Sequence, residues 1–249
     1  MEDFLVELAG VPCRIRCRYS YNRDHLRDYV TDRAPLFVVE PSEEDLRKMQ
    51  ADFDRMNEAQ GVACRSYSDS FLENNAIHAL LAEELVKHDV VLMHGSALCM
   101  DGEAYIFTAA SGTGKSTHSR LWREKFGERV WMINDDKPLL KIEKNLVTVW
   151  GSPWDGKHRL SRNASAPLKA LVWLTRDETN HIEPMSRADA FPVILRQIYH
   201  SDDPAVMTHI MELEKTLLEE AELYRLGCNM SPEAAVTAFE GMNHRTERR

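Results

Sequence analysis

A nine-residue stretch, 109–117, has the residue types and spacing of a loop that binds a polyphosphate. It reads Ala-Ala-Ser-Gly-Thr-Gly-Lys-Ser-Thr, with an apolar strand-like run at 104–108 before it and a helix-compatible run from 116 to about 125 after it. Its two glycines allow backbone conformations in which several N–H groups point inward, and a helix N-terminus adds partial positive charge. We therefore expect nucleotide binding by Ser111, Gly112, Thr113, Gly114, Lys115, Ser116 and Thr117.

Two residues of this loop have separate expected roles. Lys115 supplies a positive charge for the outer phosphates, and the Ser116 hydroxyl is a ligand for Mg²⁺. Ala109 stands where the usual pattern G-x4-G-K-[ST] has its first glycine. The sequence predicts ATP and Mg²⁺ as cofactors and leaves the choice between ATP and GTP open.

A pair of carboxylates, Asp135 and Asp136, follows the apolar run 130–133. A carboxylate at a strand end near a phosphate loop is the usual second anchor for Mg²⁺. The other carboxylate can accept a proton from an attacking hydroxyl, and two adjacent carboxylates raise one another's proton affinity. The alternative is an Asp-rich turn that opens a hairpin.

His94 and a polar loop, 151–167, add further candidates. His94 ends the strand before the loop hairpin, where it is either structural or able to tune a carboxylate or take a proton. The loop has no clear period, which favours a functional loop. Lys157, Arg159 and Arg162 in it are candidates for neutralising charge on a moving phosphoryl group, with solvated surface cations as the alternative.

Short strands joined by turns must position these groups. Asp101-Gly102 predicts a tight turn between strands at 95–100 and 104–108, and a turn at 143–145 joins strands at 138–142 and 146–150. The remaining expected elements are a buried strand at 168–174, helices at 186–200 and 204–221, a strand at 223–226, a helix after Ser231, and a frayed end at 244–249.

The first 89 residues predict a smaller α+β subdomain that binds substrate or a partner, ahead of a nucleotide-binding domain at 90–249. Strands are expected at 4–8, 12–17 and 36–39, a helix from the N-cap Ser42 to about Gln60, and a second helix after Ser68 or Ser70. Arg14, Arg16 and Arg18 recur with period two, either as a solvated face or as a contact for an acidic partner.

Composition narrows the functional classes. The formal net charge of −9 argues against nucleic acid as a partner, and no segment approaches the roughly 20 apolar residues of a membrane span. The acidic start Met-Glu-Asp-Phe is unlike a signal peptide, and the five scattered cysteines suggest reduced thiols. We expect a cytoplasmic protein without a membrane partner; the oligomeric state stays open, a homo-oligomer included.

Three motifs together resemble a known family. His94-Gly95-Ser96, the segment 111–116 and Asp135-Asp136 are similar, in order and spacing, to the C-terminal kinase domain of HPr kinase/phosphorylase, over roughly residues 90–175. The Ser-Gly-Thr-Gly-Lys core and the double Asp also resemble phosphoenolpyruvate carboxykinase. The resemblance implies an α/β fold of α+β character, whose phosphate loop sits on a mixed, largely antiparallel sheet. It also implies His94 and Asp136 at the transfer centre, and Asp135 and Ser116 near Mg²⁺.

The N-terminal residues do not resemble the usual N-terminal domain of HPr kinase. The chain looks more like stand-alone HPr-kinase-like proteins, some of which phosphorylate a Ser or Thr of a small peptide precursor or a free metabolite. We therefore expect an ATP-dependent kinase that transfers the γ-phosphate to a hydroxyl of a peptide, protein or small molecule. Asp136, aided by His94, would accept the proton, while Lys115, Mg²⁺ and Lys157 or Arg159 carry the charge. The alternatives are a carboxykinase-like lyase and a nucleotide-binding regulatory module without transfer chemistry.

Overall fold

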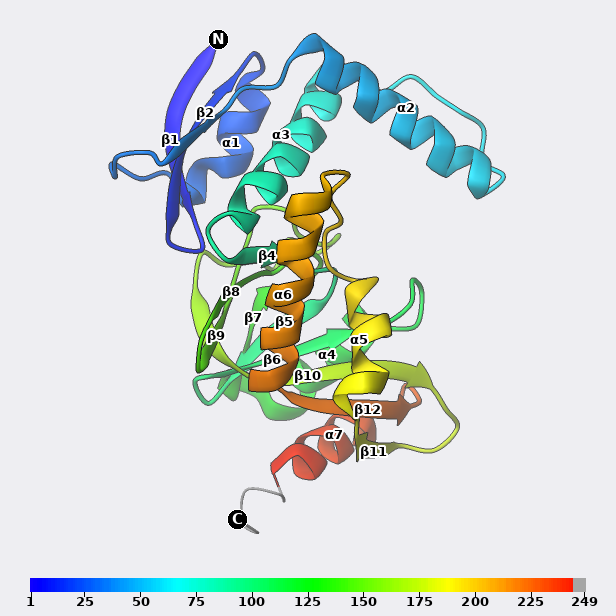
Figure 1. The fold of residues 1–249 in the computed structure, drawn as a ribbon. Helices are drawn as coiled ribbons and strands as arrows, with labels where there is room; N and C mark the ends of the chain where they lie inside the picture. Colours follow the sequence, from blue (N-terminus) through cyan, green and yellow to red (C-terminus); the bar gives the residue numbers. More distant parts are fainter. Residues whose placement is uncertain (244–249) are drawn as a thin grey trace. The chain divides into compact units, whose positions relative to one another are not determined.

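The computed structural model describes residues 1–243, and the chain divides into two compact units, Met1–His88 and Asp89–Arg249 (Figure 1). The frayed end expected at 244–249 lies outside the described residues. Each unit has its own sheet and helices. A role for the first unit in binding substrate or a partner stays a prediction.

Within residues 1–88, three strands and three α-helices form the first unit. The strands are β1 (Glu2–Leu8), β2 (Val11–Cys17) and β3 (Phe37–Val39), and the helices are α1 (Ser20–Leu26), α2 (Glu43–Ala59) and α3 (Asp69–Val86). β1 and β2 are an antiparallel hairpin, and β3 lies parallel to β2. Ala9 and Gly10 both have positive φ, as a two-residue hairpin turn requires. Ser42 caps α2 through a reciprocal bond pair with Asp45, which confirms the predicted start.

Helix α1, followed by a 3₁₀ turn at Arg27–Tyr29, was not predicted from the sequence. A buried carboxylate from a distant part of the chain organises it. Glu73 of α3 accepts hydrogen bonds from the backbone N–H groups of Arg18 (2.8 Å) and Tyr19 (3.2 Å), and from the side chain of Asn22 (2.6 Å). Because this acceptor lies 51 to 55 residues downstream of its donors, no local pattern in 20–26 predicts the helix.

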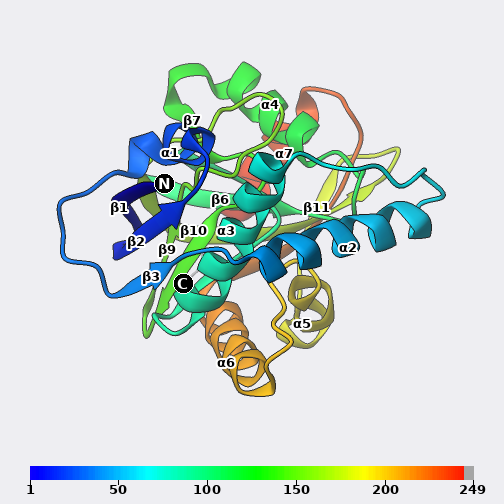
Figure 2. The ribbon, with the colours of Figure 1, turned by 90° about the horizontal axis from the view of Figure 1, so that it is seen from above.

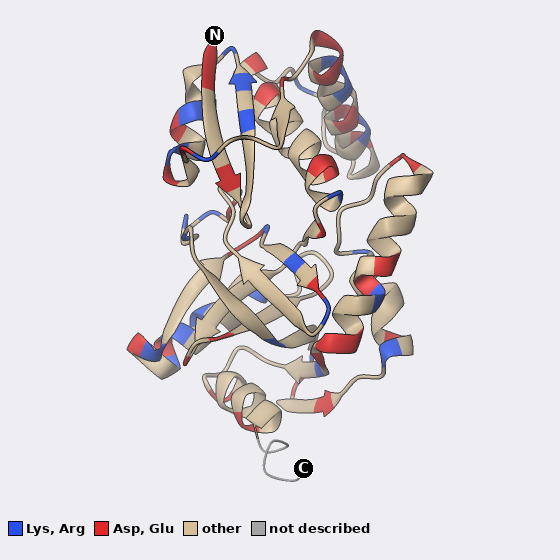
Figure 3. Cartoon of the chain, turned by 60° about the vertical axis from the view of Figure 1, so that its left-hand side comes forward, with Lys and Arg blue, Asp and Glu red and all other residues tan. Residues whose placement is uncertain are grey.

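The arginines of β2 have acidic partners within their own unit. Arg14 pairs with Asp3 (2.7 Å), Arg16 with Asp3 and Glu40, and Arg18, directly after β2, with Glu43. Figure 3 shows basic residues on β2 beside acidic ones on β1. Exposed pairs of this kind contribute at most about 1 kcal/mol each. Their charges are balanced locally, which favours the solvated face over a contact for an acidic partner.

Within residues 89–243 the second unit is built on a mixed nine-stranded sheet. Seven strands follow the order β4-β8-β9-β10-β6-β5-β7; β12 pairs with β10, and β11 pairs with β12. Only the β10 pairs with β6 and β12 are parallel among these described strands. The prediction of an α+β chain with a mixed, largely antiparallel sheet is confirmed. The strands are β4 (Val90–Leu92), β5 (Ser96–Met100), β6 (Glu103–Thr108), β7 (Val130–Asn134), β8 (Leu139–Glu143), β9 (Leu146–Trp150), β10 (Ser165–Arg176), β11 (His181–Pro184) and β12 (Glu222–Cys228).

Strand β10 is longer than the sequence indicates. Residues 165–167 pair with β9, and from Leu168 onward the strand pairs with β6 and then β12 through an irregularity at 168–170. Pro167 has no N–H to donate to a neighbouring strand. It is tolerated at the point where β10 passes from one neighbour to the next. The predicted loop 151–167 therefore ends at 164.

Two pairs of helices lie on opposite sides of these strands. Helices α4 (Lys115–Phe126) and α7 (Glu233–Asn243) pack together on one side, and α5 (Arg187–Leu195) and α6 (Pro204–Glu220) pack together on the other (Figure 2). Trp122 of α4 is fully buried against Tyr105 and Phe107 of β6, with ring centroids 5.2 and 5.3 Å away. This aromatic contact anchors the helix that follows the phosphate loop. Among residues 1–243, none of the helices combines the length and the hydrophobicity that a membrane span requires.

Glu214 of α6 makes stability depend on pH. Its side chain is fully buried, and although it approaches the backbone of Leu195, neither carboxyl oxygen has a hydrogen bond of good geometry among the described residues. Burial raises the pKa of this carboxyl from 4.5 to about 8. Between these pH values the folded chain keeps a proton that the unfolded chain releases. Stability should therefore fall as pH rises through this window, by up to roughly 1.4 kcal/mol per pH unit.

We expect Glu214→Gln, which cannot ionise, to be more stable than wild type at pH 8, with the difference shrinking toward pH 4.5. Thermal unfolding of both proteins across this range measures it. Equal pH slopes for the two proteins would contradict the assignment.

Candidate active site

The phosphate loop joins the end of β6 to the start of α4. Gly112 (φ 75°) and Gly114 (φ 126°) take the positive φ values that favour glycine, and the N-cap Gly114 brings no side chain to cap the first turn of α4. The N–H groups of that turn are thus oriented for a ligand. Ala109 is fully buried and outside the positive-φ region, so this position does not require the glycine of the usual pattern.

Arg176, the last residue of β10, braces the loop and was missed by the sequence analysis. Its guanidinium donates to the carbonyl oxygens of Gly112 (2.5 Å) and Thr113 (3.4 Å). Lys115 Nζ lies 3.4 Å from the carbonyl oxygen of Ala109, which keeps the ammonium above the loop. Since Arg176 is 63 and 64 residues from Thr113 and Gly112 in sequence, only the parallel pairing of β10 with β6 brings it to the loop.

Ser116 and Asp135 are brought together at the start of α4. Asp135 is buried directly after β7, its carboxylate accepts a hydrogen bond from Ser96 (3.2 Å), and the Ser116 hydroxyl lies close enough to act on its pKa. Burial raises the pKa of Asp135, while Ser96, His158, Ser116 and Arg123 act in the opposite direction. A Cβ on Gly156 would lie 2.6 Å from Asp135 Oδ2, so only glycine lets the loop approach this closely.

These donors fit Mg²⁺. A hydroxyl and a carboxylate in contact are the protein ligands that Mg²⁺ takes when phosphates and water complete its octahedron. No group of three or more His, Cys, Asp or Glu side chains in residues 1–243 has the arrangement of an all-protein metal cage.

His94 and Asp136 are also brought together, next to Lys115. His94 Nε2 lies 3.4 Å from Asp136 Oδ1, and Lys137 Nζ lies 3.1 Å from Asp136 Oδ2. Burial lowers the pKa of His94 to about 4, assisted by the positive charges of Lys137 and Lys115 and opposed by Asp136. The imidazole is therefore neutral at pH 7, and its contact with Asp136 is not an ion pair. Burial also lowers the pKa of Lys115.

Three hydrogen bonds fix the backbone around His94. Its N–H donates to Gln197 O (2.6 Å), its carbonyl oxygen accepts from Thr108 Oγ1 (2.8 Å), and the next N–H, of Gly95, donates to Asp136 O (3.1 Å). The first of these bonds explains why α5 ends at Leu195, short of the predicted residue 200. After the helix the chain runs along β4, with a bridge between Ile198 and Met93.

Asn134, at the end of β7, sets the directions of the two aspartates. It is fully buried, and its Oδ1 accepts from the N–H groups of Asp136 (2.8 Å) and Lys137 (2.6 Å). Its Nδ2 donates to both oxygens of Ser152, and Ser152 Oγ in turn donates to Lys137 O (2.6 Å). Because this turn is fixed, Asp135 contacts Ser116 while Asp136 contacts His94 and Lys137. The sequence pattern identified neither Asn134 nor Lys137.

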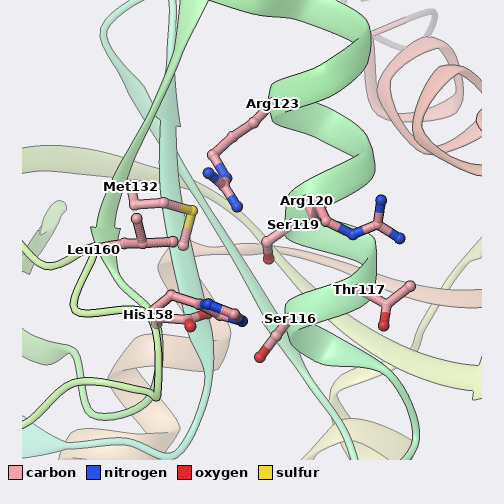
Figure 4. A pocket seen from close by; sticks show the side chains of 9 residues that line it. Ser116, Thr117, Ser119, Arg120, Arg123, Met132, His158 and Leu160 are labelled. Atoms are coloured by element: carbon pink, nitrogen blue, oxygen red, sulfur yellow. The ribbon is translucent and has the colours of Figure 1, made fainter.

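The three cations of the 151–164 loop are not gathered at these aspartates. Lys157 and Arg159 are exposed, and the guanidinium of Arg162 lies 5.5 Å from the ring of Trp131. Instead, their neighbours His158 and Leu160 line a cavity of about 400 Å³ beside α4 (Figure 4). The cavity's other walls are Ser116, Thr117, Ser119, Arg120, Arg123, Met132 and Asp135. A charge-neutralising role for Lys157 and Arg159 stays a prediction.

Lys137 should control the protonation of His94. In Lys137→Met one of the two positive charges that depress the pKa of His94 is gone, so this pKa should rise from about 4 toward its ordinary value. An NMR titration of the histidine C–H resonances measures it, with Lys144→Met, in the exposed turn between β8 and β9, as the matched control. Identical His94 titration in Lys137→Met and wild type would show that Lys137 does not act on His94.

Comparisons with known proteins find no matching family model and no matching curated protein. Among solved structures, the Hpr(Ser) kinase/phosphatase from Coxiella burnetii matches 63% of this chain and 97% of its own, at 14% sequence identity and a TM-score of 0.36. This is a distant fold similarity, and it does not define the reaction.

Proposed function

We propose that the chain is a Mg²⁺-dependent phosphotransferase that moves the terminal phosphoryl group of a nucleoside triphosphate, ATP in the first instance, to a hydroxyl of a peptide, protein or small molecule. One observation carries the proposal. Lys115 directly precedes Ser116, which lies near Asp135, and its ammonium interacts electrostatically with Asp136 and Lys137 of the His94 cluster, so a carboxylate is close to the place where the outer phosphate would sit.

The residues supply the parts of an in-line transfer. The acceptor oxygen attacks the γ-phosphorus, the bond from that phosphorus to the β,γ-bridging oxygen breaks, and the acceptor's proton goes to a carboxylate oxygen of Asp136. Lys115 and Lys137 offset the charge on the moving group. Neutral His94 and Lys137 hold Asp136 toward the acceptor. Ser116 and Asp135 would hold Mg²⁺, which neutralises charge on the outer phosphates.

Incubation with γ-labelled ATP, Mg²⁺ and a panel of hydroxyl acceptors tests the proposal. Peptides containing Ser or Thr and small polyols form the panel, and Asp136→Asn is the matched control. We expect label in an acid-stable phosphate ester with wild type only, and in the Ser or Thr peptides this ester is also labile to alkali. Nucleotide binding without any transfer, even to water, would favour a regulatory module instead.

A further inference from the structure

The cavity beside α4 leads away from the transfer centre. It is lined by Ser116, Thr117 and the next turns of α4 on one side, and by Met132, His158 and Leu160 on the other (Figure 4). Lys115, His94 and Asp136 do not line it. It therefore does not present an acceptor to the carboxylate that would take its proton.

The usual geometry of phosphate loops indicates which part of a nucleotide would face this cavity. In such loops the backbone N–H groups cradle the α- and β-phosphates and the lysine reaches the β- and γ-phosphates. In this chain the γ-phosphate would therefore lie at Lys115, whose charge acts on His94 and Asp136. The α end then lies toward Thr117, where the cavity begins. At about 400 Å³ it is within the range of small-molecule sites.

We propose that this cavity binds the nucleoside of the phosphate donor and that Arg123 selects guanine over adenine. The inference rests on the proposed function for the orientation of the phosphates, and it deepens that function by naming the donor base. Met132 and Leu160 supply apolar surface for the faces of the base, and Figure 4 shows the Arg123 guanidinium reaching into the space between α4 and these two residues.

Arg123 is the cation with unused hydrogen-bonding capacity here. Its Nε is buried and has no hydrogen-bond partner in the described part of the chain, whereas the neighbouring Arg120 is paired with Glu124 (2.7 Å). Arginine pairs with two acceptors at once, such as O6 and N7 of guanine. Adenine instead offers N7 and an amino donor, which Asn or Gln matches, and neither residue type lines the cavity. Its one lining carboxylate, Asp135, already accepts a hydrogen bond from Ser96 and lies next to the Ser116 hydroxyl.

Titration calorimetry with three ligands in Mg²⁺ buffer tests this assignment: GTP, ATP and inorganic tripolyphosphate, which lacks a nucleoside. Wild type should bind GTP about tenfold more tightly than ATP, and both more tightly than tripolyphosphate. Arg123→Gln should lose or reverse the preference for guanine, while its affinity for tripolyphosphate stays within about twofold. Lys125→Gln, an exposed residue of the same helix that does not line the cavity, is the matched control.

A second variant keeps the test decisive if Arg123→Gln fails to fold. Leu160→Trp fills the cavity from the loop and should weaken both nucleotides at least tenfold without weakening tripolyphosphate. Wild type that binds ATP as tightly as GTP would overturn the base preference. Loss of tripolyphosphate binding in Arg123→Gln, equal to its loss of GTP, would show that the cavity holds phosphate and would overturn the nucleoside site. Guanine-selective binding without phosphoryl transfer would leave this inference standing and refute the proposed function.

Discussion

Replacement of Asp136 by Asn should lower kcat for phosphoryl transfer by about 1000-fold and leave nucleotide affinity within about twofold of wild type. The amide has nearly the same shape as the carboxylate but does not take the acceptor's proton. Asp136 contacts His94 and Lys137, whereas the buried contact with the metal-binding hydroxyl of Ser116 belongs to Asp135. Single-turnover transfer and calorimetric nucleotide binding, measured on the same preparation, separate the two effects.

Asp135→Asn is the matched control for that experiment, because it changes the neighbouring carboxylate in the same way. We expect it to raise the Mg²⁺ concentration needed for half-maximal activity, since Asp135 and Ser116 are the proposed ligands. Equal losses of binding and turnover in Asp136→Asn, or a shift of its Mg²⁺ requirement as large as that of Asp135→Asn, would contradict the division of roles.

Replacement of Lys115 by Met should weaken both nucleotide binding and turnover, with kcat/KM falling by about 1000-fold or more. Its ammonium is the charge above the loop, 3.4 Å from Ala109 O, and burial makes it an effective partner for phosphate because competing water is reduced. Tripolyphosphate affinity should fall together with that of the nucleotides, since the lysine contacts phosphate and not the base.

Lys125→Met is the matched control: it removes the same charge from an exposed position of α4 that lies ten residues further along the chain, away from the loop. It should leave binding and turnover unchanged. A Lys115→Met protein that still binds tripolyphosphate like wild type would show that the phosphates lie elsewhere, and the proposed site would fall with it.

The parts of the site that were predictable from sequence are local in the chain. The strand, glycine-rich loop and helix start follow one another within about twenty residues, so their types and spacing indicate the loop directly. Asp135 and Asp136 stand at the end of an apolar run, where a strand end is expected. The antiparallel hairpins also have short-range turn signals, such as Asp101-Gly102.

What the sequence analysis missed depends on distant parts of the chain. Arg176 reaches the phosphate loop only because β10 lies parallel to β6, and the start of α1 is organised by the buried Glu73. Lys137 directly follows the two aspartates, yet a lysine after a strand reads as a surface charge. Its role became visible only with the contact to Asp136 and the Asn134 turn. In the 151–164 loop, the sequence drew attention to the cations, whereas the fold turns His158 and Leu160 into the cavity.

Phosphoryl transfer itself is the most direct test of this account. Wild type, Asp136→Asn and Asp135→Asn are incubated with γ-labelled GTP or ATP, Mg²⁺ and the panel of hydroxyl acceptors, and ³¹P NMR follows both ester formation and slow transfer to water. We expect Mg²⁺-dependent transfer by wild type, none above background with Asp136→Asn, and recovery of Asp135→Asn at high Mg²⁺. Equal transfer by wild type and Asp136→Asn, or tight nucleotide binding with no transfer to any acceptor or to water, would contradict it.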